Sequence, residues 1–119
     1  MTSAMDQGAN CLFCGFASGD IPVDKVAEND LAFAINDINP VAPTHILIIP
    51  KKHDENAVAT MSTDRESLVA IFSLLKEIVA DSGLEAYRTV FNTGSSAGQS
   101  VFHTHLHLIA GRALTWPPG

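Results

Sequence analysis

A ten-residue segment, from Val101 to Ala110, constrains this chain more than any other stretch. Its side chains alternate in character, which predicts a long β-strand. Because strand side chains alternate between two faces, His103, His105 and His107 would share one face, with neighbours about 6.5 Å apart and the outer pair about 13 Å apart. A metal–nitrogen bond is only about 2.1 Å long. A straight strand therefore could not bring His103 and His107 to one metal ion, although two neighbours could share one.

Three histidines in register suggest chemistry near neutral pH. If all three were ordinary core residues, each would need its own buried hydrogen-bond partner, which makes a purely structural role the weaker interpretation. A row of imidazoles can supply a nucleophile, a proton donor and an orienting partner without a metal ion. Attack of an imidazole nitrogen on phosphorus, through a phospho-histidine intermediate, fits this set. The Gly- and Ser-rich segment 93–100 could bind an anion through backbone N–H groups, although it lacks the Gly-Lys-Ser/Thr ending of a P-loop.

Size and charge limit the classes of protein to consider. The 119 residues predict a single domain, 1–119. Seven basic against thirteen acidic residues give a net charge of −6, which speaks against a nucleic-acid scaffold. The first ten residues lack the charged and apolar regions of a secretory signal. Apolar runs such as Ile46 to Ile49 are too short to span a membrane. We therefore expect a cytoplasmic protein.

The remaining sequence predicts several strands around one dominant helix, an α+β fold. Strands are expected at 31–36, 45–49 and 89–92. Helical spacing of apolar residues predicts a helix over 64–82, with a capping box formed by Thr63 and Glu66 and a terminating Gly83.

Cys11 and Cys14 are the two cysteines of the chain, in a C-x-x-C spacing. They are too few and too close for a disulfide-stapled secreted fold. The spacing is compatible with half of a metal site, with a redox pair, or with two free buried thiols.

Longer motifs resemble a known family. The segment Gly98-Gln-Ser-Val-Phe-His-Thr-His-Leu-His107-Leu-Ile is similar to the signature of the histidine triad (HIT) family. Further motifs resemble the histidine triad nucleotide-binding (HINT) branch: Phe33-x-x-x-Asp37-Ile, Ala42-Pro-Thr-His45, Ile49-Pro-Lys-Lys-His53, Asn92-x-Gly94 and Trp116-Pro-Pro-Gly119. Thr104 stands where the signature has an apolar residue. With a histidine at position 107 the chain resembles the hydrolase branches of the family, because the uridylyl-transferase relatives carry Gln there.

The resemblance implies a HIT-like fold: an antiparallel sheet of about five strands with one long and one short helix, extended across a homodimer. It also implies an adenosine 5′-monophosphoramidase-like hydrolase that binds a purine nucleotide of the AMP or GMP type and cleaves P–N bonds of nucleoside phosphoramidates. Two alternatives stay open: a non-catalytic purine-nucleotide-binding regulatory protein, and a dinucleoside polyphosphate hydrolase.

The same resemblance assigns roles to residues. His105 would be the nucleophile, His107 would stabilise phosphate oxygen and assist the leaving group, and His45 would complete the histidine network. The catalytic set also includes Ser100. The nucleotide-binding set is Phe13, Phe33, Asp37, Ile38, Asn92, Gly98, Gln99, Ser100, Val101, His105, His107 and Trp116.

Two further assignments follow from the resemblance. Asp37 would accept hydrogen bonds from ribose hydroxyls, although it could instead cap the turn at Asn39-Pro40. Bacterial members of the family suggest a structural zinc site, separate from catalysis, whose ligands are Cys11, Cys14, His53 and His103.

Overall fold

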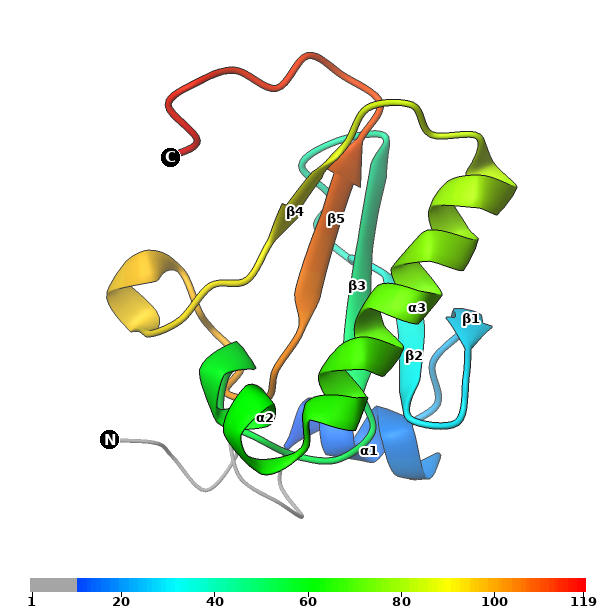
Figure 1. Cartoon of the computed structure of the whole chain (residues 1–119), viewed down its shortest axis with the longest axis vertical. Helices are drawn as coiled ribbons and strands as arrows, with labels where there is room; N and C mark the ends of the chain where they lie inside the picture. Colours follow the sequence, from blue (N-terminus) through cyan, green and yellow to red (C-terminus); the bar gives the residue numbers. More distant parts are fainter. Residues whose placement is uncertain (1–10) are drawn as a thin grey trace.

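A five-stranded antiparallel sheet forms the centre of the computed structural model, which describes residues 11–119. The strand order is β1-β2-β3-β5-β4 (Figure 1). The strands are β1 (Lys25–Glu28), β2 (Ala32–Asn36), β3 (Thr44–Pro50), β4 (Arg88–Val90) and β5 (Leu106–Ala110). The helices are α1 (Leu12–Ser18), α2 (Ala57–Thr63) and α3 (Arg65–Ser82), with a 3-10 turn, η3 (Ser95–Ala97). The predicted α+β class and antiparallel sheet are confirmed, with two short helices beside the long one.

Helix α3 covers one face of the sheet (Figure 1). Ile71, Leu74 and Ile78 recur with helical spacing and pack against Ile48 and Leu108 of the central strands. The helix begins at the N-cap Asp64, whose carboxylate accepts hydrogen bonds from the backbone N–H and hydroxyl of Ser67.

The ends of α3 test two details of the predicted helix. The predicted capping box was wrong by one residue, because Thr63 is the last residue of α2 and Asp64 takes the N-cap place. Gly83 ends the helix with a φ of 66°, as predicted, in the left-handed region that glycine adopts without strain.

The opposite face of the sheet carries a second apolar cluster, which α1 covers. Phe33, Ile35 and Leu47 belong to this cluster, together with Phe13 of α1. Residues between them, such as Ala34, belong to the core under α3. Both faces of β2 and β3 are therefore buried, and α1 leaves part of the second face for functional side chains.

The predicted strand 101–110 is wrong in its first half. β5 begins only at Leu106, and its pairing with β3 starts at Ile48 opposite Leu106. Before that point the backbone leaves the ladder: Thr104 N–H donates to the carbonyl of Asp54. The predicted strand 89–92 is likewise shorter, since β4 ends at Val90. The histidines are consequently not spaced as on one straight strand.

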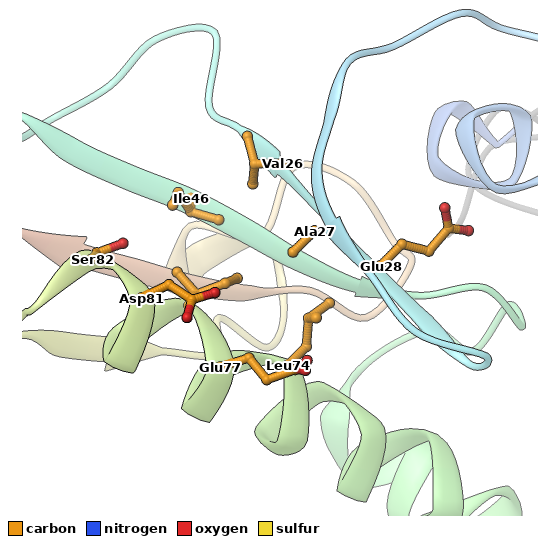
Figure 2. A pocket seen from close by; sticks show the side chains of 9 residues that line it. Val26, Ala27, Glu28, Ile46, Leu74, Glu77, Asp81 and Ser82 are labelled. Atoms are coloured by element: carbon orange, nitrogen blue, oxygen red, sulfur yellow. The ribbon is translucent and has the colours of Figure 1, made fainter.

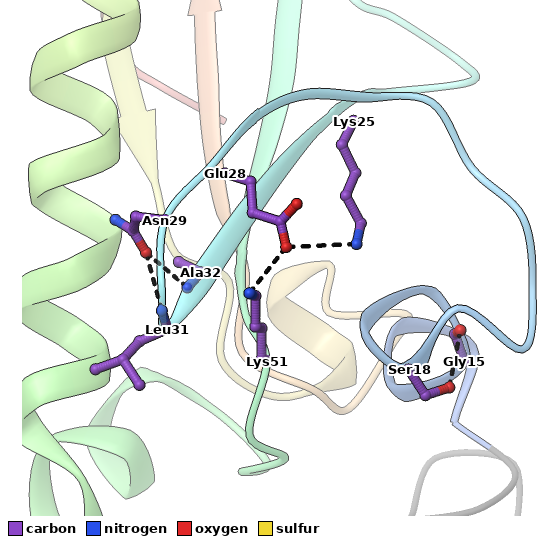
Figure 3. A network of polar contacts seen from close by, with 8 residues as sticks. All are labelled: Gly15, Ser18, Lys25, Glu28, Asn29, Leu31, Ala32 and Lys51. Atoms are coloured by element: carbon purple, nitrogen blue, oxygen red, sulfur yellow. Dashed lines mark hydrogen bonds and ion pairs between the residues drawn. The ribbon is translucent and has the colours of Figure 1, made fainter.

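A polar network holds the edge strand β1 to its neighbours (Figure 3). The Glu28 carboxylate lies 2.8 Å from Lys51 Nζ and 3.6 Å from Lys25 Nζ. The Asn29 side chain closes the turn to β2, where its oxygen accepts from the backbone N–H groups of Leu31 and Ala32.

A groove of about 300 Å³ lies between β1 and α3 (Figure 2). Apolar Val26, Leu74 and Ile78 share its lining with acidic Glu28 and Asp81. It opens on the α3 side of the sheet, and none of the five histidines lines it. No helix in residues 11–119 is both long and apolar enough to cross a membrane.

Candidate active site and metal centre

Three histidine rings meet on the α1 side of the sheet. His45 lies on β3 and His107 on β5, and antiparallel pairing of Leu47 with His107 puts both histidines on one face. His45 Nε2 lies 2.9 Å from His107 Nδ1. His105 directly precedes β5, and its ring centroid lies 5.0 Å from that of His107. The structure therefore brings together the three histidines to which the family resemblance assigned catalytic roles.

Hydrogen bonds define which nitrogen of His105 carries the proton. Its Nδ1 lies 2.7 Å from the carbonyl oxygen of His103, an atom that can only accept. Nδ1 must therefore be the donor. In a neutral imidazole this leaves Nε2 with a free lone pair, which is the atom a nucleophile needs.

The same reasoning runs through His45 to His107. Val41 N–H donates to His45 Nδ1 over 3.1 Å, so the proton of neutral His45 sits on Nε2. That proton is donated to His107 Nδ1, which places the His107 proton on its own Nε2. Within residues 11–119, His107 Nε2 is a buried atom without a hydrogen-bond partner. A buried, unpaired donor beside a free imidazole lone pair is suited to hold a phosphoryl oxygen.

Burial keeps the rings of His105 and His107 neutral. It lowers the pKa of His105 below its ordinary value, mainly because the charged form loses its hydration. It also lowers the pKa of His107 to about 4, with smaller contributions from the neighbouring His105 and His45. Both rings are therefore uncharged at neutral pH.

Asp37 has two contacts at the end of β2. One carboxylate oxygen accepts from Asn39 N–H at 2.8 Å, which is the turn-capping role considered above. The other lies 3.3 Å from His45 Nε2. Asp37 thus borders the histidine cluster while it fixes the turn, and the neighbouring Ile38 is 91% exposed.

The segment before the histidines is held by the Gln99 side chain. Its oxygen accepts from Gly94 N–H at 2.9 Å, and its amide donates to the carbonyls of Glu55 and Val101. The sequence analysis assigned Gln99 to nucleotide binding through its backbone and missed this anchoring role of the side chain. The residues around Gln99 carry no pattern that would predict it.

Other members of the nucleotide-binding set lie along the same segment. Gly98 adopts a φ of 98°, and the Asn92 side-chain amide lies 3.6 Å from the position that a Cβ on Gly98 would take. Ser100 is exposed beside Gln99.

Cys11, Cys14, His53 and His103 form a second cluster. His103 Nδ1 lies 3.5 Å from each sulfur and 3.1 Å from His53 Nδ1, and Cys14 Sγ lies 3.4 Å from His53 Nδ1. His103 Nε2 donates to the carbonyl of Pro50 at 2.7 Å, so its Nδ1 keeps a free lone pair. His103 belongs to this cluster and His107 to the other.

The donor set fits a tetrahedral zinc ion. With Zn–N and Zn–S bonds of about 2.1 and 2.3 Å, ligand atoms around such an ion lie about 3.4 to 3.8 Å apart. The observed separations are close to this range. Burial and the neighbouring Cys11 raise the pKa of Cys14 to about 12, so the thiol would remain protonated without a cation to stabilise the thiolate. Backbone bonding of the second nitrogen of His103 is also typical of metal ligands.

The remaining predicted site residues differ in exposure. Phe13 and Phe33 are buried in the apolar cluster behind the histidines. Trp116 is 83% exposed on a tail that continues past the end of β5, whereas His105 precedes the start of that strand (Figure 1).

Comparisons with known proteins agree with this geometry. The HIT domain family matches residues 18–114. The chain belongs to the HIT domain family. A solved HIT family hydrolase from Legionella pneumophila is 48% identical, with a TM-score of 0.86 over 92% of this chain and 100% of that one.

Two further relatives have informative descriptions. A 14 kDa zinc-binding protein from Zea mays is 45% identical over 84% of this chain and 80% of its own length. A solved histidine triad nucleotide-binding protein from Candida albicans is 30% identical, with a TM-score of 0.77 over 90% of this chain and 82% of that one.

Proposed function

We propose that this HIT protein is a purine nucleoside phosphoramidate hydrolase, which cleaves a P–N bond and releases a nucleoside monophosphate. The observation that carries the proposal concerns two neighbouring rings. His105 Nε2 has a free lone pair, and His107 Nε2–H has no hydrogen-bond partner among residues 11–119. The description of the Legionella relative as a hydrolase supports the reaction class. The description of the Candida relative as nucleotide-binding supports the ligand class.

The reaction would take place in two displacements. His105 Nε2 attacks the α-phosphorus, and the P–N electron pair leaves with the amine, which takes a proton from solvent. Water then attacks the same phosphorus, the N–P bond to His105 breaks, and the water proton returns to solvent. The nucleotidyl-histidine intermediate divides one difficult displacement into two easier ones. His107 Nε2–H would stabilise the charge on the phosphoryl oxygen in both steps.

The surrounding residues would bind the rest of the nucleotide. Ser100 and Asn92, with the backbone of Gly98, Gln99 and Val101, would contact the phosphate or leaving group. Asp37 would accept from the ribose hydroxyls.

The base would bind beside Ile38, whose exposed side chain is free to contact it. Phe33 and Phe13 would support this pocket from behind, because both are buried. Trp116 would serve the active site of a second subunit.

We also propose that the Cys2His2 cluster binds structural zinc. Zinc held there would tie α1 to the segment before β5, and four protein ligands would leave no open position for catalysis. The zinc-binding description of the maize relative supports the choice of metal.

A homodimer is the proposed assembly. β4 is an edge strand of the sheet, and an edge strand can pair with a second copy. An apolar groove on α3, lined in part by Val69 and Phe72, lies beside it, and the Phe72 ring contacts Phe91 just after β4. The half-exposed Phe72 would become buried between subunits.

Substrate competition tests the proposed reaction. Release of nucleotide is measured from AMP and GMP phosphoramidates and from a dinucleoside polyphosphate. We expect the phosphoramidates to react fastest, and His105→Ala to bind AMP like the wild type while it loses turnover. Faster cleavage of the dinucleotide would favour the polyphosphate hydrolase, and AMP binding without any turnover in the wild type would favour a regulatory protein.

A further inference from the structure

His103 connects the two clusters. Its ring contributes Nδ1 to the Cys2His2 cluster, and its other nitrogen is held by the Pro50 carbonyl. Its backbone carbonyl accepts the Nδ1 proton of His105 at 2.7 Å. The ring of His103 is fully buried and bonded at both nitrogens, so the position of its carbonyl depends on the cluster.

Phe13 makes a second connection. It lies between the two cysteines on α1, and its ring is edge-on to His105, with centroids 5.0 Å apart and planes at 82°. The same ring is edge-on to His103 at 5.8 Å. Phe13 is 4% exposed, so it forms a fixed wall for the imidazole of His105. Ligation of Cys11 and Cys14 would hold this wall in place.

His105 needs this support because of its tautomer. A neutral imidazole free of constraints favours the proton on Nε2, which would block the nucleophilic lone pair. In the structure the proton is held on Nδ1 by the His103 carbonyl. If the His105 ring could rotate or shift away from that carbonyl, it would no longer favour the Nδ1–H tautomer.

We propose that the Cys11–Cys14–His53–His103 cluster is a positioning device for His105, acting through the His103 carbonyl and the Phe13 ring. Phe13 is then a positioning residue and not only a core side chain. The consequence for turnover rests on the proposed hydrolase function, whereas the consequence for the tautomer does not.

The test compares the metal-loaded wild type with Phe13→Leu, with His53→Ala and with wild type stripped by a chelator. Ile71→Val is the matched control, because it removes buried apolar volume on the opposite face of the sheet. Circular dichroism and elemental analysis report folding and metal content. Nitrogen NMR of ¹⁵N-histidine protein reports the His105 tautomer, and kcat with AMP phosphoramidate and the Kd for AMP are measured alongside.

We expect a single Nδ1–H tautomer of His105 in the loaded wild type and in Ile71→Val. Phe13→Leu, which should keep its metal, and the two metal-poor samples should show a mixture of tautomers. In all three samples kcat should fall at least about tenfold, as expected when a reacting group is misplaced. In the two metal-poor samples, which keep Phe13, the Kd for AMP should stay within about twofold.

Two results would overturn the proposal. One is an unchanged Nδ1–H tautomer in folded Phe13→Leu and in the stripped wild type. The other is a mixture of His105 tautomers in Ile71→Val as large as that in Phe13→Leu, which would show a general effect of destabilisation. If the wild type itself does not hydrolyse phosphoramidates, the proposed function fails, and the tautomer measurement alone still decides this inference.

Discussion

At the scale of single residues, the site depends on which ring nitrogens carry protons. The backbone carbonyl of His103 fixes the proton of His105, and Val41 N–H fixes that of His45. His107 therefore keeps its donor on the one nitrogen that has no protein partner in residues 11–119. A row of identical residues thus acquires different roles from different hydrogen bonds.

The lowered pKa of His107 predicts how stability depends on pH. Its pKa is about 4 in the folded chain and 6.5 in an unfolded one, so between these values the unfolded chain binds more protons. The contribution of neutral His107 to the free energy of unfolding is complete above pH 6.5 and is lost as the pH falls towards 4. Urea denaturation from pH 4 to 7 should show a shallower decline in His107→Gln than in the wild type. Equal pH slopes in the two chains would contradict the assignment.

At the scale of elements, the loop before the histidines depends on Gly98. Its φ of 98° is strained for any residue with a Cβ, and that Cβ would lie 3.6 Å from the Asn92 amide. We expect Gly98→Ala to lose about 1 kcal/mol of stability and to lower kcat by moving the loop. Gly83→Ala is the matched control, since Gly83 also has a positive φ but ends α3 and has open space around it. If both variants kept full kcat, the loop would not be part of the site.

The metal cluster makes a prediction for α1, because Cys11 is the N-cap of this helix and Cys14 lies in its first turn. Purified protein should carry about one zinc ion per chain, as four ligands make one tetrahedral site. Cys14→Ser should lose the metal and lower the melting temperature, as chelation should in the wild type. Freshly prepared wild-type protein without bound metal would contradict the zinc proposal.

Elements with a strong local signal could be predicted from the sequence. The apolar spacing of α3 and its end at Gly83 are local properties, as are the proline boundaries of β3. The half-strand before Leu106 could not be predicted, because its alternation is typical of a strand and its departure depends on the distant carbonyl of Asp54. The role of Gln99 was missed for the same reason, since one of its partners is 44 residues away.

The candidate site was predictable as a set of residues but not as a geometry. The family resemblance indicated His45, His105 and His107, and the structure brings them together. The family resemblance also grouped His103 with the cysteines, and the structure places it there. The break in the strand before β5 was not predicted, because residues 101–105 alternate as a strand does.

At the scale of the whole molecule, the net charge of −6 says little about the ligand. An anionic phosphate would be bound by neutral imidazole N–H and backbone N–H groups, whose effect is local. The excess of acidic residues is compatible with a nucleotide site for this reason.

The proposed dimer can be tested through its apolar groove. Phe72→Glu puts a charge where two α3 helices would meet, so it should shift the protein to monomers in analytical ultracentrifugation. Val58→Glu is the control, because Val58 is more exposed and lies on α2. A wild-type protein that is monomeric at all concentrations would contradict the dimer.

The central claim is that His105 is the nucleophile, and trapping the intermediate tests it most directly. Wild-type protein is mixed with AMP phosphoramidate, quenched within milliseconds and analysed by peptide mass spectrometry. The account predicts one adenylyl group on His105, which forms and decays at rates compatible with turnover and is absent from His105→Ala. Turnover of the phosphoramidate with no adenylyl group on His105, or with the group on another residue, would contradict it.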